Sequence, residues 1–149
     1  MTNEHKHTTE HETLLGVDFG ETNTGLAFGK AGLVSPIKVM PSKDIHAAIH
    51  EIVRFTIHNK VDKLVVGLPL AYDGKETPQA RKVRHFIKLL KVRIKKPIVL
   101  YNEYGSTKES LKETIDYGLS QRGRRSIDHY SAAVILKKYF ETEKEHRKD

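Results

Sequence analysis

Three short apolar segments follow one another near the start of the chain and constrain its fold more than any other feature. They cover residues 14–20, 24–30 and 33–39, with Gly20 just before the first connection and Gly32 in the second. Strands joined by connections this short pair as antiparallel hairpins. We therefore expect any sheet that this chain forms to begin with an antiparallel meander.

Helix and strand patterns alternate through the next part of the chain. We expect a helix to open at Pro41-Ser42, because apolar residues recur there at helical spacing: Ile45, Ile49, Ile52, Val53 and Ile57. A nearly continuous apolar run at 63–68 predicts a strand that is covered on both faces. Thr77 and Pro78 are typical of a helix start, and the apolar stripe of that helix comprises Val83, Phe86, Ile87 and Leu90.

One more strand and two more helices complete the predicted order. The strand covers residues 97–101, and a capping box at 106–109 starts the next helix. Ser126 caps the last helix, which would run to about Lys144. This order predicts an α/β fold with a five-stranded mixed sheet, in which the first, fourth and fifth strands are parallel and helices lie on both faces.

Length and composition limit the class of protein. The chain has 149 residues, enough for one domain, which we expect to span residues 14–140 between a disordered tail at 1–13 and a frayed end at 141–149. The absence of cysteine excludes disulfides, thiolate metal sites and cysteine nucleophiles, and it fits a reducing compartment, so we expect a cytoplasmic protein. The apolar runs are too short for a membrane span, and the first residues lack the apolar region of a signal peptide.

Positive charge is concentrated in two places. The formal net charge is +7, and residues 75–96 hold nine basic residues and one acidic residue. A second cluster surrounds Gly123 in a predicted turn. Both clusters are candidate contacts for nucleic-acid phosphates, and both are also compatible with an ordinary solvated surface. The candidate nucleic-acid-binding residues are Lys75, Arg81, Lys82 and Arg84 in the first cluster and Arg122, Arg124 and Arg125 in the second.

Three acidic residues stand out by their places in this pattern. Asp18 lies inside an apolar strand, where Asp is almost never buried without a partner. Glu103 follows the last strand, and Asp128 lies in the first turn of the last helix, where the helix dipole favours a negative charge. Ligands of open α/β sheets gather at the carboxyl ends of the parallel strands. Carboxylates that converge there need a hard divalent cation to offset their repulsion, but each acid alone also fits an ordinary structural place, so spacing leaves the metal site open.

Four segments of the chain carry a resemblance to a known family. They are Gly16-Val17-Asp18-Phe19-Gly20 through Gly25-Leu26-Ala27, Val65 to Leu70 with Asp73-Gly74, Glu103 with Ser106-Thr107, and Ile127-Asp128 through Ile135-Leu136. Together they resemble the YqgF family, also called RuvX, which comprises Holliday-junction-resolvase-like proteins with an RNase H-like fold. The Val-Gly-Leu-Pro-Leu run and the last-helix pattern are specific to this family, whereas the first-strand pattern is not.

The resemblance implies an activity and a set of site residues. It implies a nuclease that matures the 5′ end of the small-subunit ribosomal RNA precursor. It also implies that Asp18, Glu103 and Asp128 are the catalytic and metal-binding acids, and two Mg²⁺ or Mn²⁺ ions held there would support in-line phosphodiester hydrolysis. The expected partner is nucleic acid, RNA rather than branched DNA, within pre-ribosomal particles. We expect a monomer or weak dimer with no membrane partner.

The chain departs from the family pattern at two places. Asn23 stands where the family usually has Arg, and Asn102-Glu103-Tyr104 stands where Asp-Glu-Arg is usual. Arg makes bidentate phosphate contacts that Asn and Tyr cannot replace, so a catalytically weakened RNA- or ribosome-binding module is an open alternative. A single-lobe nucleotide-binding protein is another, because residues 18–25 also resemble the phosphate-binding turn of the actin-like ATPases.

Overall fold

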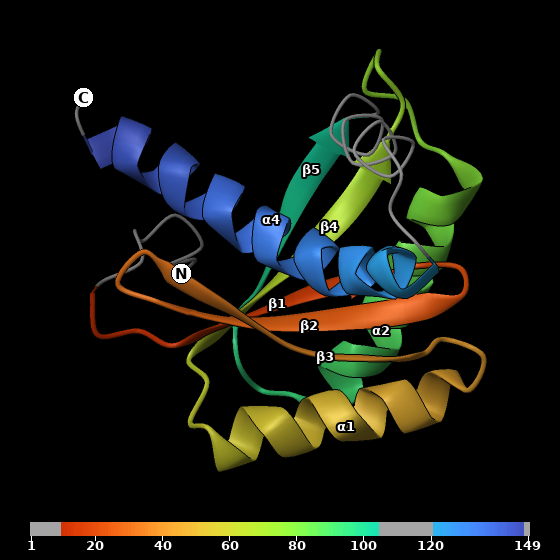
Figure 1. Cartoon of the computed structure of the whole chain (residues 1–149), viewed down its shortest axis with the longest axis horizontal. Coiled ribbons are helices and arrows are strands. Elements are labelled where there is room, and N and C mark those ends of the chain that lie inside the picture. The colour runs from red at the N-terminus through yellow and green to blue at the C-terminus, as the bar shows by residue number, and fades with distance from the viewer. Residues whose placement is uncertain (1–9, 105–120, 148–149) are drawn as a thin grey trace.

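The structure, a computed structural model, describes residues 10–104 and 121–147, with side chains for 10–104 and 131–145. The chain forms one sheet of five strands in the order β3-β2-β1-β4-β5, with helices on both faces (Figure 1). The strands are β1 (Leu14–Phe19), β2 (Asn23–Lys30), β3 (Leu33–Pro41), β4 (Lys63–Leu70) and β5 (Ile98–Tyr104). The described helices are α1 (Ile45–His58), α2 (Pro78–Arg93) and α4 (Gln121–Arg147).

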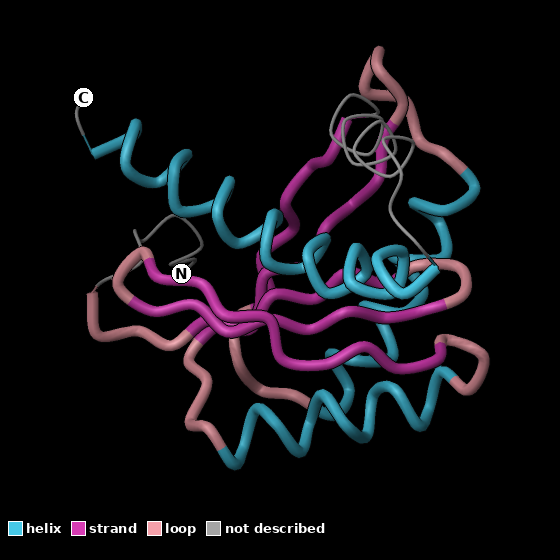
Figure 2. The backbone as a smooth tube through the Cα atoms, in the orientation of Figure 1, coloured by secondary structure: helices cyan, strands magenta, loops and turns pink. Residues whose placement is uncertain are grey.

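The pairing of the strands confirms the predicted mixed sheet. β1, β2 and β3 form an antiparallel meander, which the tube in Figure 2 follows as three neighbouring strands. β4 pairs in parallel with β1, and β5 pairs in parallel with β4. The carboxyl ends of β1, β4 and β5 therefore lie at one edge of the sheet, which we call the carboxyl edge.

The two faces of the sheet bury different apolar clusters. α1 and α2 cover one face, where Phe19 of β1 stacks on Phe86 of α2 with ring centroids 4.3 Å apart. α4 crosses the other face (Figure 1), where Leu14 of β1 and Leu136 of α4 belong to one cluster of buried apolar residues. Because successive strand residues point to opposite faces, the even-numbered residues of β1, from Leu14 to Asp18, face α4.

Glycines on three strands allow α4 to lie close against the sheet. A Cβ atom added at Gly16 would lie 2.6 Å from Leu136 Cγ, and one added at Gly29 would lie 2.9 Å from Phe140 Cε2. A Cβ atom added at Gly67 would lie 2.6 Å from Ile135 Cδ1. Any side chain at these positions would push the helix away from the strands.

The start of α1 differs from the prediction. Pro41 ends β3, an edge strand, where proline costs no ladder hydrogen bond. The helix begins at Ile45, and its N-cap is Asp44, whose carboxylate accepts a hydrogen bond from the backbone N–H of Ala47 at 3.1 Å. Ile57 is 71% exposed and does not belong to the core face.

The start of α2 was predicted correctly. Thr77 is its N-cap and accepts a hydrogen bond from the backbone N–H of Ala80 at 3.0 Å, and Pro78 is the first helical residue. All four residues of the predicted apolar stripe are buried: Val83, Phe86, Ile87 and Leu90. The helix predicted from residues 106–109 onward lies outside the described residues. No helix in the described part of the chain is long and apolar enough to cross a membrane.

A surface cluster on α1 yields a prediction about acid stability. Glu51 accepts hydrogen bonds from Arg54 at 2.9 Å and Lys38 at 2.7 Å, and these bonds lower the pKa of its carboxyl from 4.5 to about 2. A folded-state pKa below the unfolded value stabilises the fold above pH 4.5, and this stabilisation is lost as the pH falls toward 2. We expect Glu51→Gln to lower the free energy of unfolding at pH 7 by at most about 1 kcal/mol.

Urea denaturation of both proteins from pH 7 to pH 2 measures this effect. The difference between parent and variant should shrink steadily below pH 4.5. If the two proteins differ in unfolding free energy by the same amount at every pH, the ionised Glu51 carboxylate is not the source of the stabilisation.

Candidate active site

Asp18 is the first of the predicted acids, and it lies buried on the face that α4 covers. Its side chain is 7% exposed, and it is the last residue but one of β1. Its Cα partner in β2 is Gly25, which has no side chain to compete for space on that face. The carboxylate therefore lies close to the carboxyl edge, between the sheet and α4.

Glu103 lies inside β5, although the sequence placed it beyond the strand. β5 runs to Tyr104, three residues further than predicted, because residues 102–104 continue the parallel ladder with β4. Val99 and Tyr101 pack in the apolar cluster under α4, so strand alternation puts Glu103 on the same face. Its side chain is 4% exposed. Two of the predicted acids are thus buried on one face near the carboxyl edge.

Gly67 leaves space for the side chain of Glu103 on the face of the sheet that also carries Asp18. β4 lies between β1 and β5, and a Cβ atom added at Gly67 would lie 2.5 Å from Glu103 Oε2. The carboxylate of Glu103 therefore occupies the position where β4 would otherwise carry a side chain, and it reaches across β4 toward the strand of Asp18. The sequence pattern does not mark Gly67 as a site residue, although a glycine inside a strand signals close approach.

Asp128, the third predicted acid, is not in the first turn of its helix. α4 begins at Gln121 rather than at Ser126, so Asp128 is the eighth residue of the helix. Its side chain lies outside the part of the chain whose side chains are described. Within that part, no three potential metal ligands come together.

The chemistry of Asp18 and Glu103 fits a divalent cation. Both side chains offer only oxygen donors, which hard divalent cations prefer. Burying negative charge costs free energy unless positive charge offsets it, and both carboxylates are buried on the same face. The space over Gly67 is shared by a carboxylate oxygen of Glu103 and the Cδ1 methyl group of Ile135. These two residues could hold a metal ion between the sheet and α4.

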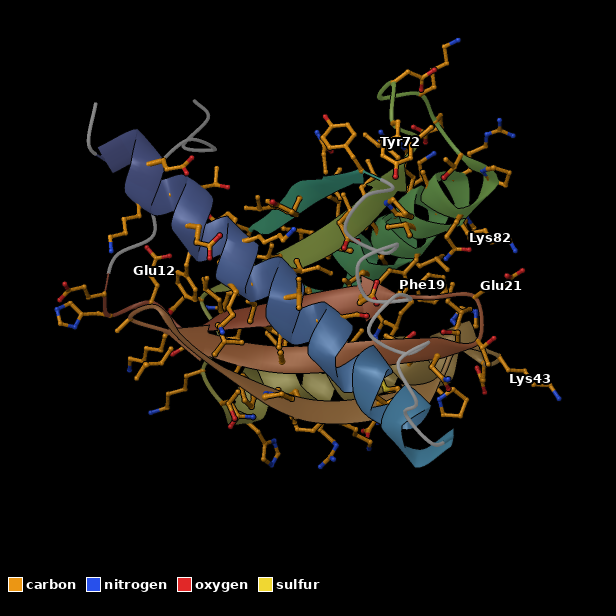
Figure 3. All side chains as sticks on the ribbon, turned by 45° about the horizontal axis from the view of Figure 1, so that its top comes forward. Glu12, Phe19, Glu21, Lys43, Tyr72 and Lys82 are labelled. Atoms are coloured by element: carbon orange, nitrogen blue, oxygen red, sulfur yellow. The ribbon has the colours of Figure 1, made fainter. Side chains whose placement is uncertain are left out.

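A basic hollow lies at the same edge of the sheet, on the side of α1 and α2. Its volume is about 520 Å³, and it is lined by Phe19, Gly20, Glu21, Ser42, Lys43, Ile45, Arg81, Lys82 and His85. Figure 3 shows Glu21, Lys43 and Lys82 at the same end of the molecule, with Glu12 at the opposite end. Lys82 Nζ lies 3.4 Å from Glu21 Oε1 in an exposed ion pair. Two predicted nucleic-acid contacts, Arg81 and Lys82, therefore line one hollow.

The other predicted basic contacts have different surroundings. The Arg84 guanidinium donates to Glu76 at 2.6 Å, which lowers the pKa of that carboxyl, and Lys75 lies 3.7 Å from Asp73. The cluster around Gly123 lies in α4 and not in a turn. The side chains of its members, Arg122, Arg124 and Arg125, lie outside the described ones.

Both departures from the family pattern fall at the carboxyl edge. Asn23 is the first residue of β2, and it shares a strand face with Ala27 and Gly29, which face α4. Tyr104 is the last residue of β5 and is 43% exposed. Asn23 therefore lies on the face that carries the buried acids, and Tyr104 directly follows one of them.

The sequence of the chain matches those of a known protein family. The sequence model of RuvX, described as Holliday junction resolvase, matches residues 12–142. The chain belongs to the RuvX family. A curated relative from Nitratidesulfovibrio vulgaris, named "Putative pre-16S rRNA nuclease", is 34% identical over 130 residues, which is 85% of this chain and 90% of the relative. A relative of the same name from Klebsiella pneumoniae is 32% identical over 132 residues, which is 87% of this chain and 96% of the relative.

Solved structures show the same fold at low sequence identity. RuvC from T. thermophilus, bound to a Holliday junction substrate, matches with a TM-score of 0.50 and 15% identity over 62% of this chain and 65% of that one. The fowlpox virus Holliday junction resolvase matches with a TM-score of 0.50 and 14% identity over 87% of this chain and 98% of that one. The RuvX chain thus has the RNase H-like fold that its sequence predicts.

The position of Gly67 yields a prediction about activity. In Gly67→Ala the new methyl group would overlap Glu103 Oε2 and displace the carboxylate. A displacement of about 1 Å in a catalytic group can cost about 10²-fold in rate. We expect a loss of that order in the rate of RNA cleavage, assayed with Mn²⁺.

Gly16→Ala is the matched control, because its methyl group would meet Leu136 and the backbone of Ala132 but no acid. Both variants should unfold at lower temperature, since overpacking typically costs about 1–3 kcal/mol. Equal losses of activity in the two folded variants would mean that Gly67 only spaces the helix.

Proposed function

We propose that this RuvX protein is a divalent-metal-dependent nuclease that hydrolyses phosphodiester bonds in the small-subunit ribosomal RNA precursor. One observation carries the proposal: the buried carboxylate of Glu103 reaches across Gly67 toward the strand of buried Asp18, at the carboxyl edge of the sheet. Membership of the RuvX family and the names of the curated relatives support the choice of substrate.

The acidic residues are assigned to binding the metal. Asp18 and Glu103 would hold the cation, and we assign Asp128 of α4 as the third acid. Mg²⁺ or Mn²⁺ bound there would lower the pKa of the attacking water and stabilise the leaving oxygen. α4 excludes bulk water from the acids, which strengthens their interaction with positive charge.

The substrate is held by charges outside this acidic site. Arg81 and Lys82 line the basic hollow at the same edge, and such side chains hold a nucleic-acid backbone without reading its sequence. We assign RNA within pre-ribosomal particles as the partner and a monomer or weak dimer as the acting form.

Single-turnover cleavage of a ribosomal RNA precursor with Mn²⁺ tests the proposal. Asp18→Asn and Glu103→Gln should each lower the rate by about 10³-fold or more, because several kcal/mol of charge stabilisation depends on the bound cation. Glu12→Gln is the control, because Glu12 is an acid at the other end of the molecule (Figure 3). Thermal unfolding checks that each variant is folded. A parent protein that cleaves no faster than Asp18→Asn would contradict the nuclease function.

The weakened binding module is the second candidate, and the position of Asn23 favours it. Asn23 lies on the face of the acids, where Arg would add charge stabilisation to the transition state. One such donor is typically worth about 10²–10³ in rate, so Asn23→Arg should raise the cleavage rate far more than the affinity. If the parent binds RNA but neither the parent nor Asn23→Arg cleaves it, the protein is an RNA-binding module without nuclease activity.

The basic hollow yields a prediction about salt. Each phosphate contact releases a counterion, so removing a contact makes the dependence of affinity on salt shallower by about 0.7 in log–log slope for a single strand. We expect a change of about 1.4, which is about 0.7 for each of the two side chains, for Arg81→Gln combined with Lys82→Gln, measured by fluorescence anisotropy between 50 and 200 mM salt. Lys95→Gln combined with Lys96→Gln removes the same charge beside Glu12, in another hollow. If both pairs change the slope equally, the hollow does not direct binding.

A further inference from the structure

The loop after β4 is a closed turn that presents Tyr72 to solvent. The backbone N–H of Gly74 donates to the carbonyl of Ala71 at 2.8 Å, and the N–H of Ala71 donates to the carbonyl of Lys75 at 3.0 Å. Gly74 has a φ of 79°, which few other residues adopt without strain. The turn is therefore held by its own backbone, and Tyr72 at its tip is 63% exposed (Figure 3).

Tyr104 lies against the same turn. It is the last residue of β5, and its Cα pairs with Leu70, the last residue of β4. Its ring atom Cε1 lies 3.9 Å from the position of a Cβ atom added at Gly74. The ring is 43% exposed. Two partly exposed tyrosine rings are thus carried by one rigid corner of the carboxyl edge.

These two rings are unusual among the exposed apolar side chains. The described part of the chain has six large apolar residues of high exposure: Leu33, Ile57, Tyr72, Val92, Leu100 and Tyr104. The two aromatic ones belong to one corner of the molecule, because Tyr104 lies against Gly74 of the turn that contains Tyr72, and Tyr104 directly follows Glu103. Exposed aromatic rings contribute little to the folded core, so their position near the buried acids indicates a role in binding.

The surroundings indicate what covers these rings. α2 starts shortly beyond the turn, at Pro78, and its first part carries Arg81 and Lys82, which line the basic hollow. A partner that meets both surfaces needs flat apolar faces and negative charge within the same molecule. Single-stranded nucleic acid has both, because its unpaired bases stack on aromatic rings while its phosphates meet Lys and Arg.

We infer that Tyr72 and Tyr104 form a stacking platform for unpaired bases next to the scissile phosphate, so that the substrate is a single-stranded segment. This inference rests on the proposed nuclease function. A base-paired helix keeps its bases stacked on one another and offers no free face to the rings. The site would therefore select its target by the absence of pairing, without reading the sequence.

Binding in the Asp18→Asn background tests the platform without any need for cleavage. The probes are a fluorescent 12-nucleotide single-stranded RNA and a blunt RNA duplex of 12 base pairs. Tyr72→Ala combined with Tyr104→Ala should weaken single-strand binding by about 5- to 150-fold for each stacked base lost. Duplex binding should stay unchanged, and so should the salt slope, because no phosphate contact is removed.

Two controls separate stacking from other roles. Tyr72→Phe combined with Tyr104→Phe keeps both rings, so it should bind the single strand within about 2-fold of the parent background. Val92→Ala removes an exposed apolar side chain from α2 and should have no effect. Thermal unfolding shows whether each variant keeps the fold.

Three results would overturn the platform: equal losses on single strand and duplex, Phe variants as weak as the Ala variants, or no loss with Ala. Failure to bind RNA in either form would overturn it too. The nuclease function fails separately, when the parent with Tyr72 and Tyr104 intact binds RNA but cleaves no faster than Asp18→Asn.

Discussion

The close packing of α4 on the sheet is the constraint on which the candidate site depends. Gly16, Gly29 and Gly67 lie under the helix, and a methyl group at any of them would overlap a side chain of α4. Glycine inside a strand weakens the strand, because it loses more conformational freedom on folding and packs no side chain. The close approach of α4 to the sheet offsets that cost by burying apolar residues of the helix. It also places α4 over Asp18 and Glu103.

Covering two acids in this way sets the electrostatics of the site. A carboxylate interacts with a cation much more strongly under a helix than in water, because the effective dielectric constant is lower. The same burial makes two neighbouring negative charges costly. The basic residues of α2 do not share this space, because α2 packs on the opposite face of the sheet. The sheet therefore keeps the basic side chains to which we assign substrate binding apart from the acids to which we assign metal binding.

The antiparallel start of the sheet, the parallel relation of β1, β4 and β5 and the cover of helices on both faces were predictable from the sequence, because they follow from short connections, apolar periodicity and the alternation of helices with strands. The residues at which the strands and helices begin and end were harder to predict. β5 extends to Glu103 and Tyr104 because they continue the ladder with β4, and a polar sequence does not reveal such pairing. Pro41 closes an edge strand instead of opening α1. The acids were found by residue type, but the role of Gly67 depends on which strand lies between theirs, and sequence spacing does not reveal strand order.

The two faces of the sheet also determine the path that a substrate strand must take. The buried acids lie on the α4 side, whereas the basic hollow lies on the α1 and α2 side. A nucleic-acid strand that meets both has to pass around the carboxyl edge, where Tyr104 and the turn of Tyr72 are exposed. A single strand has the flexibility to bend around that edge, but a duplex is stiff, with a persistence length of about 150 base pairs in DNA. The separation of acids from cations and the exposed rings thus favour the same class of substrate.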